Sequence, residues 1–157
     1  MSSEFCLALL LDGPLQSWGF ASRFDRRTTA LHPTRSGTLG MIAAAMGIDK
    51  FDESEAMRLS QFDALRVTTV SLGRQDPRGH RLPMRRIEDY HTIQGIRRAS
   101  GKVDPTGTVQ SYRHYLQDAR FGLLIEGPQS LLETIASALK DPKWGVWLGR
   151  KSCIPAS

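Results

Sequence analysis

The sequence predicts an α+β fold in which two β-α-β units are separated by a long insert. Two observations lead to this prediction. Short apolar runs alternate with amphipathic helical patterns along the 157 residues, and an arginine-rich stretch between the two units shows no long periodicity. A chain of this length can bury a sizeable hydrophobic core, so we expect residues 1–157 to form a single domain.

The first strand and the first helix are predicted from apolar spacing. Phe5–Leu11 is a continuous apolar run that is too short for a stable helix, so we expect a strand buried on both faces. Apolar residues then recur at helical spacing up to Met46. Ser36 is the expected N-cap of this helix, and Gly47 is expected to end it.

The middle of the chain predicts a helical turn, a strand and an insert. Asp52–Gln61 favours a short acidic helical turn, and Leu65–Leu72 is rich in the β-branched residues typical of strands. Glycine, proline and charged residues dominate from Arg74 to Tyr112. We interpret the region of about 74–115 as a loop or a protruding hairpin. Connections of this length are usually functional, so we expect this insert to have a function.

The second unit repeats the pattern of the first. Phe121–Glu126 predicts the third strand, and Pro128 at a first-turn position opens an amphipathic helix that Asp141-Pro142 closes. Val146–Leu148 is the expected last strand. The order β-α-β, insert, β-α-β is the split βαβ pattern (βαββαβ) of ferredoxin-like folds, which RNA-recognition domains share.

Charge is concentrated in the insert. The chain carries a formal net charge of +5 and a pI near 9.6, which favours an anionic partner. Residues 74–120 contain ten basic and five acidic side chains, so this stretch supplies the whole surplus. Nine of the ten cations are arginine, the residue suited to bidentate phosphate contacts and to stacking on bases.

Several other classes of protein are disfavoured. Cys6 and Cys153 lie far apart, and neither they nor the four histidines show metal-ligand spacing, so we expect no metal and no cofactor. The first residues lack the basic start of a signal peptide, and no apolar run approaches the ~20 residues that span a bilayer. We expect a cytoplasmic protein without a membrane partner.

The loop that follows the first strand is the first candidate binding region. It offers Arg23, Arg26, Arg27 and Arg35 to phosphates, and the amides of Ser36 and Gly37 lie at the start of a helix, where the dipole favours an anion. Trp18 and Phe24 are candidates for stacking on bases; alternatively, both cover the first strand as core residues. Arg26 and Arg27 have their own alternative, a solvated turn paired with Asp25.

Two later segments complete the candidate site. In the insert, cations alternate with rings in a pattern that suits single-stranded RNA, at Arg85, Arg86, Tyr90, His91 and Arg113. The alternative is a protein-binding hairpin that faces an acidic neighbour. Arg150 and Lys151 follow the last predicted strand and could hold a phosphate or form a charged sheet edge.

Catalysis is the competing function. His91 or His114, beside tyrosines, could withdraw a 2′-hydroxyl proton while an arginine or lysine stabilises the developing charge. That chemistry would make the protein a metal-independent endoribonuclease. Binding without catalysis is the reading that we favour.

A resemblance supports that reading. The carrying motifs run nearly end to end and in order: Gly13-Pro14-Leu15-Gln16-Ser17-Trp18-Gly19, Ser22-Arg23-Phe24, Arg26-Arg27-Thr28, Pro33-Thr34-Arg35-Ser36-Gly37, Arg86-Ile87-Glu88-Asp89-Tyr90-His91-Thr92, Tyr115-Leu116-Gln117-Asp118-Ala119-Arg120-Phe121 and Leu148-Gly149-Arg150-Lys151-Ser152-Cys153. Together they resemble the CasD family of the RAMP superfamily, the subunits that bind the crRNA 5′ handle in the type I-E CRISPR surveillance complex, Cascade.

The resemblance implies a fold, partners and a role. It implies a ferredoxin-like RAMP domain with a thumb-like hairpin inserted between its middle strands. Such a domain caps the complex, holds the crRNA 5′ handle for antiviral defence and meets target DNA only through the complex. For the endoribonuclease alternative, it implies CRISPR repeat RNA as the substrate. The implied neighbours are the backbone subunit CasC and the large subunit CasA. The family usually continues beyond the last predicted strand, so we expect a C-terminal part to be missing. The complete candidate RNA-binding set is Gln16, Ser17, Trp18, Arg23, Phe24, Arg26, Arg27, Arg35, Ser36, Gly37, Arg85, Arg86, Tyr90, His91, Arg113, Arg150 and Lys151, with no catalytic residue.

Overall fold

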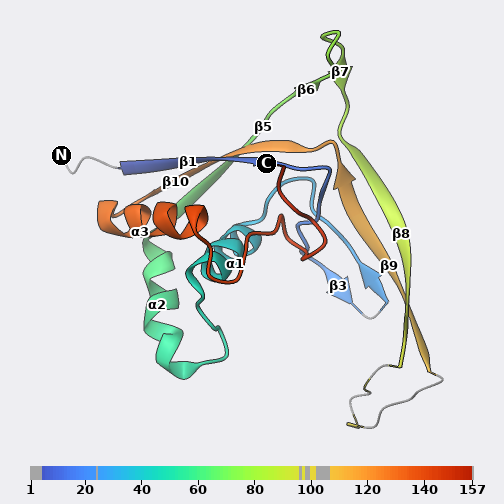
Figure 1. Cartoon of the computed structure of the whole chain (residues 1–157), viewed down its shortest axis with the longest axis horizontal. Helices are drawn as coiled ribbons and strands as arrows, with labels where there is room; N and C mark the ends of the chain where they lie inside the picture. Colours follow the sequence, from blue (N-terminus) through green and yellow to red (C-terminus); the bar gives the residue numbers. More distant parts are fainter. Residues whose placement is uncertain (1–4, 24, 96, 98–99, 102–106, 157) are drawn as a thin grey trace.

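The protein has a mixed α and β architecture built on antiparallel sheets (Figure 1). The computed structural model describes residues 5–23, 25–95, 97, 100–101 and 107–156. In this described part, three α-helices lie beside a three-stranded sheet, and a second sheet extends away from them. No helix among the described residues is long and apolar enough to cross a membrane.

The three-stranded sheet is the platform for the helices. Its order is β1 (Phe5–Asp12), β10 (Arg120–Gly127) and β5 (Arg66–Ser71), with β10 antiparallel to both neighbours. The helices α1 (Arg35–Met46) and α3 (Gln129–Lys140) pack on one face of it. The shared core joins apolar residues of the helices and the central strand, including Ile42, Ile125 and Ile135.

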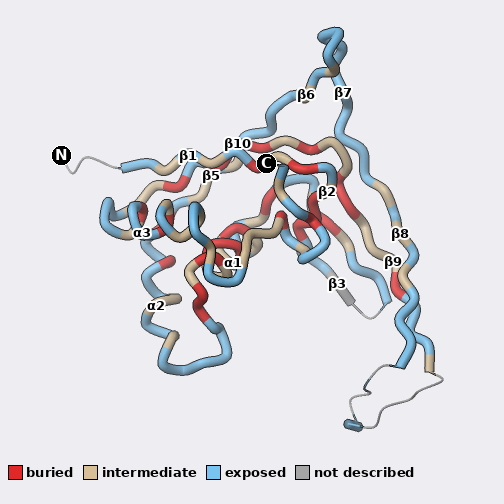
Figure 2. Tube along the Cα trace, viewed as in Figure 1, coloured by how far each residue is buried: buried red, intermediate tan, exposed pale blue. Residues whose placement is uncertain are grey.

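The opposite face of this sheet is open, which corrects one prediction. We expected the first strand to be buried on both faces, but exposed residues alternate along it and Leu10 is 55% exposed. Leu124 and Val70 are also exposed on the neighbouring strands (Figure 2). Side chains alternate along a strand. Because α1 and α3 lie on the same face of the sheet, only every second side chain of β1 faces them. A continuous apolar run did not reveal this.

The first helix ends where predicted but begins earlier. Thr34, not Ser36, is its N-cap, because the Thr34 hydroxyl accepts a hydrogen bond from the Gly37 amide. Gly47 ends the helix in the left-handed conformation, as expected. The predicted acidic turn is confirmed as two short 3₁₀ turns, Glu53–Glu55 and Gln61–Ala64, on either side of α2 (Ala56–Ser60).

The second helical unit is confirmed, but the last predicted strand is wrong. The helix α3 follows Pro128, which is its N-cap rather than a first-turn residue. Residues 146–148 form no strand. The backbone there bends at Gly145 and Gly149, both with positive φ, and Leu148 bonds Ser17 on one side and Cys153 on the other. Its polar groups are satisfied by loops instead of by a sheet edge.

The insert contains two hairpins. The small one pairs β6 (Arg74–Gln75) with β7 (Arg81–Leu82), and the long one pairs β8 (Arg85–Gln94) with β9 (Thr108–Gln117) over ten residues. On its other edge β9 pairs with two segments of the first loop. These are β2 (Leu15–Gln16) and β4 (Arg26–Arg27), the latter hairpinned with β3 (Ser22–Arg23). The first loop and the insert therefore form one sheet, with β9 in the middle.

Candidate nucleic-acid interface

The root of the first loop, which holds three of the predicted contact residues, is part of the core. Gln16, Ser17 and Trp18 are all buried, and the Trp18 side chain is only 1% exposed. The Gln16 amide donates to the carbonyls of Leu11 and Ala119 and accepts from the Trp18 indole nitrogen at 3.0 Å. These buried side chains hold the loop in place through hydrogen bonds within the protein.

Residues at the start of α1 also make hydrogen bonds within the protein. The Gly37 amide bonds the Thr34 hydroxyl, and a Cβ added to Gly37 would lie 2.9 Å from the Trp18 ring. Glycine is needed here so that the indole can pack against the helix. The Arg35 guanidinium donates to the carbonyls of Phe62 and Leu65. Of the predicted phosphate-binding residues Arg35, Ser36 and Gly37, the first and the last therefore make hydrogen bonds within the protein, and Ser36 is exposed.

Strand alternation divides the remaining predicted residues between two faces of the second sheet. Residues that pair directly across neighbouring strands project to the same face. Tyr90 pairs with Tyr112, which pairs in turn with Arg26, whereas Arg113 pairs with Arg27. The adjacent arginines of the first loop thus point to opposite sides.

One side, here called the tyrosine face, consists of Arg26, Arg86, Glu88, Tyr90, Tyr112 and His114. The Tyr90 and Tyr112 ring centroids lie 5.3 Å apart, and the Arg26 guanidinium lies 5.2 Å from the Tyr112 centroid. Arg26 is 64% exposed and lies 3.7 Å from Glu88, which also pairs with His114 at 2.9 Å. Tyr90 is 49% exposed, whereas Tyr112 is half-buried beneath Arg26 and Tyr90. The exposed Tyr90 ring and Arg26 guanidinium can stack on unpaired bases.

A hollow of about 470 Å³ adjoins this face. Phe20, Leu31 and His32 line it from the first loop, and Arg86 lines it from β8. Phe20 is 69% exposed although it is fully apolar. The sequence prediction missed Phe20, Leu31 and His32; an aromatic residue directly after the Trp18-Gly19 pair was the available signal.

The other side, here called the histidine face, consists of Arg27, Arg85, Asp89, His91 and Arg113. The His91 Nε2 atom lies 2.6 Å from an Asp89 carboxylate oxygen. Arg113 donates to the Ser111 hydroxyl, while Arg27 and Arg85 are exposed. This face holds more cations but no exposed ring pair among the residues that the structure describes.

The last predicted cations differ from each other. Arg150 donates to the carbonyls of His114 and Arg27 and lies 4.8 Å from the Tyr115 ring centroid, so it joins three segments of the fold. Lys151 is exposed beside the Trp147 ring. Burial raises the pKa of the neighbouring Cys153 thiol, which makes that cysteine a poor nucleophile.

Two predicted contacts cannot be placed. Phe24 and the side chain of Arg23 lie outside the described residues. No group of three or more metal-ligating side chains gathers in the described part of the chain.

Comparisons with known proteins show which family the chain belongs to. Residues 6–157 match the family described as CRISPR-associated protein (Cas_Cas5), and the chain belongs to that family. It is 33% identical over 150 residues to the CRISPR system Cascade subunit CasD of Escherichia coli (strain K12), an alignment that covers 94% of this chain and 66% of that protein.

Solved structures show the same relationship. One chain of a CRISPR RNA-guided surveillance complex is 36% identical with a TM-score of 0.74, and covers 98% of this chain and 60% of its own length. A chain described as a Cas protein is 32% identical with a TM-score of 0.61, over 96% and 59%. The chain thus spans about two thirds of the curated relative and three fifths of these structures.

Proposed function

We propose that this chain is a non-catalytic crRNA-binding subunit of a type I-E Cascade complex, where it caps the assembly and holds the crRNA 5′ handle. Its partners would be CasC and CasA, and target DNA would be met through the complex. Membership of the Cas_Cas5 family supports this role, as do the likenesses to a Cascade subunit and to a chain of a surveillance complex.

The observation that carries the proposal is the tyrosine face and its hollow. Single-stranded RNA is held by rings that stack on splayed bases and by cations that follow the backbone. Tyr90, Tyr112 and Phe20 supply the rings, and Arg26 and Arg86 supply the cations. The buried root of the loop supports this surface from below, through the Ser17 hydroxyl bond to the carbonyl of His114.

We also infer a ferredoxin-like core of the RAMP type, with the long hairpin as its thumb. The order β1-β10-β5 supports this, because it places the third main strand between the first and second, as a split βαβ arrangement requires. The two main helices lie together on one face of that sheet, which also fits.

A binding experiment tests the proposal. Arg26→Ala with Tyr90→Ala removes two exposed groups of the tyrosine face, so the fold should persist. We expect at least about 10-fold weaker binding of repeat-derived 5′-handle RNA, since each stacked base contributes ~1–3 kcal/mol. Arg78→Ala, on the exposed turn of the small hairpin, is the matched control. Unchanged affinity in the double variant would contradict the site.

The endoribonuclease alternative has one observation in its favour. On the histidine face, the contact with Asp89 orients His91, and Arg113 is nearby on the neighbouring strand. His114 is a poorer candidate, because its side chain is only 18% exposed. Incubating the protein with repeat transcript in EDTA separates the two functions. Intact RNA supports binding alone, whereas discrete fragments that disappear with His91→Ala would establish the nuclease.

A further inference from the structure

A second hollow lies on the helical side of the molecule, and no described residue of the arginine-rich sheet lines it. It has a volume of about 510 Å³ and lies between α1 and the segment that carries α2. Its lining is mainly apolar: Leu39, Ala43, Ile48, Leu59, Phe62 and Trp144. We call it the α1–α2 groove. It is large enough to take the side chains of a partner.

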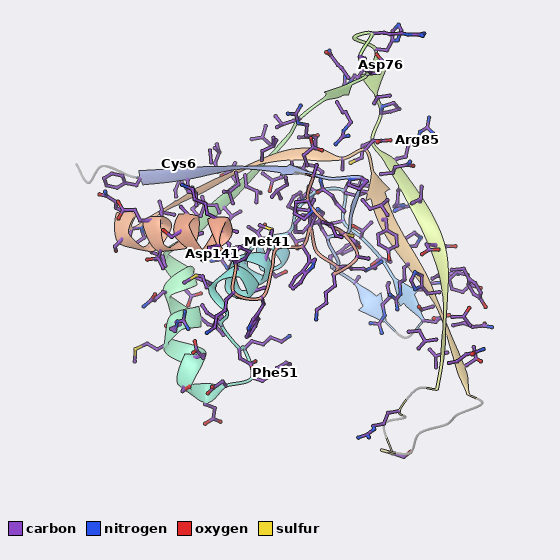
Figure 3. The ribbon with its side chains drawn as sticks, viewed as in Figure 1. Cys6, Met41, Phe51, Asp76, Arg85 and Asp141 are labelled. Carbon is purple, nitrogen blue, oxygen red and sulfur yellow. The ribbon has the colours of Figure 1, made fainter. Side chains whose placement is uncertain are left out.

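Large apolar side chains in the lining of this groove are exposed to solvent. Phe51 is 83% exposed and Trp144 is about half exposed, and both contribute to the lining. Figure 3 shows Phe51 at the tip of the loop that leads into α2, well separated from Arg85 on the long hairpin. Large apolar side chains around a hollow are typical of an interaction site.

The segment 49–63, which forms one side of the groove and is here called its acidic rim, carries the opposite charge from the rest of the chain. Residues 49–63 contain five acidic and two basic side chains, a surplus of three negative charges in a chain of net charge +5. Asp49 and Asp63 belong to the lining itself, together with one cation, Lys50, which lies over the Phe51 ring. Hydrogen bonds from Ser54 lower the pKa of Asp52, so that this carboxylate stays ionised. Glu55 is paired with Arg58.

We propose that the α1–α2 groove binds a cationic amphipathic segment of a partner protein. The apolar side chains of that segment enter the hollow, while its lysines or arginines face the acidic rim. RNA does not suit this surface, because its phosphates would meet the negative rim. The groove is therefore a protein-binding site, separate from the RNA-binding surface proposed above and not dependent on it.

Gly40 gives a variant that blocks the groove without weakening the fold. It lies in α1 within the lining, and a Cβ added there would have no neighbour within 4 Å. Leucine has a higher helix propensity than glycine, so Gly40→Leu fills the hollow while favouring the helix. Gly73→Leu is the matched control, since Gly73 also has no neighbour within 4 Å and lies outside the groove lining.

The test uses the full chain and two labelled peptides. One has leucine and lysine at amphipathic helical spacing, and the other has glutamate in place of lysine. Fluorescence anisotropy should show saturable binding of the lysine peptide only. Gly40→Leu and the double variant Asp49→Lys with Asp63→Lys should each weaken that binding about 10-fold or more. Gly73→Leu and Glu133→Lys should bind as the parent does, and handle-RNA affinity should be unchanged in Gly40→Leu.

Any of four results would overturn the proposal. Equal binding of both peptides, or no effect of the groove variants, would show that the groove does not select a cationic segment. Self-association that Gly40→Leu abolishes, measured by sedimentation, would make a second copy the occupant. Handle RNA that protects residues 39–63 from hydrogen exchange would make the groove part of the RNA interface.

Discussion

The root and the tip of the first loop both carry side chains that can bind nucleic acid, but the root is buried and the tip is exposed. At the root, Gln16 and Trp18 are buried and bonded to each other. At the tip, Arg26 lies 64% exposed over the Tyr112 ring. Amide, indole and guanidinium groups all suit nucleic acid, so composition alone does not separate a supporting residue from a binding one. Burial and hydrogen bonding do.

Gly149→Ala should have the largest effect on the root. A Cβ there would lie 1.8 Å from the Ser17 carbonyl oxygen, and Gly149 has a φ of +98°. Overlap with a buried backbone cannot be relieved by a side-chain rotation, so we expect a loss of more than about 4 kcal/mol in the free energy of unfolding. Urea denaturation measures it. Gly40→Ala, in an open helical position, should instead stabilise the fold by about 0.5–1 kcal/mol.

Gln16→Leu should have the next largest effect. It preserves the size of the side chain but leaves the Leu11 and Ala119 carbonyls and the Trp18 indole nitrogen without their partner. Each buried unsatisfied group costs about 1–3 kcal/mol, so the loss of partner for three groups should cost at least about 3 kcal/mol in thermal or urea unfolding. A smaller loss, accompanied by weaker RNA binding, would show that Gln16 contacts the ligand after all.

The adjacent residues Arg150 and Lys151 show the same contrast, because Arg150 is hydrogen-bonded within the fold and Lys151 is exposed. Arg150→Met should destabilise the fold by about 1–3 kcal/mol, because two carbonyls lose a charged donor. Lys151→Met should change stability by less than about 0.5 kcal/mol, since it is an exposed surface substitution. If Lys151 meets the RNA backbone, its loss should also reduce the salt dependence of binding. Equal destabilisation by both variants would contradict the assignment of Arg150 as the structural one.

Much of the fold could be predicted because local patterns decide it. The helical spacing up to Met46 and the β-branched run at 65–72 gave correct elements. Val146–Leu148 failed because its backbone partners, Ser17 and Cys153, come from loops that no local pattern reveals. The predicted N-cap was Ser36, whereas Thr34 is the N-cap in the structure. Both residues carry hydroxyls suited to capping, so residue type alone does not choose between them.

The candidate site was predictable in its residue types but not in its geometry. Arg26 and Arg27 are adjacent and were treated as one cluster, yet β4 pairs with β9 and sends them to opposite faces. That pairing is between segments more than eighty residues apart, so a single sequence does not disclose it. Phe20 was missed for the same reason: its role depends on the hollow that Arg86 completes from a distant strand.

The division into two faces leads to the prediction with the smallest effect on stability. Arg26→Ala and Arg27→Ala each remove one exposed side chain from the same two-residue strand, so neither should change the free energy of unfolding by more than about 0.5 kcal/mol. Both remove one positive charge, so any difference in handle-RNA affinity reports the face and not the charge. Because Arg26 stacks on Tyr112, its loss should weaken binding about 10-fold, and Arg27→Ala should weaken it by less than about 3-fold. A larger loss of affinity for Arg27→Ala than for Arg26→Ala would indicate that the RNA binds on the histidine face. That face carries His91, so the same result would also give the nuclease alternative its strongest support.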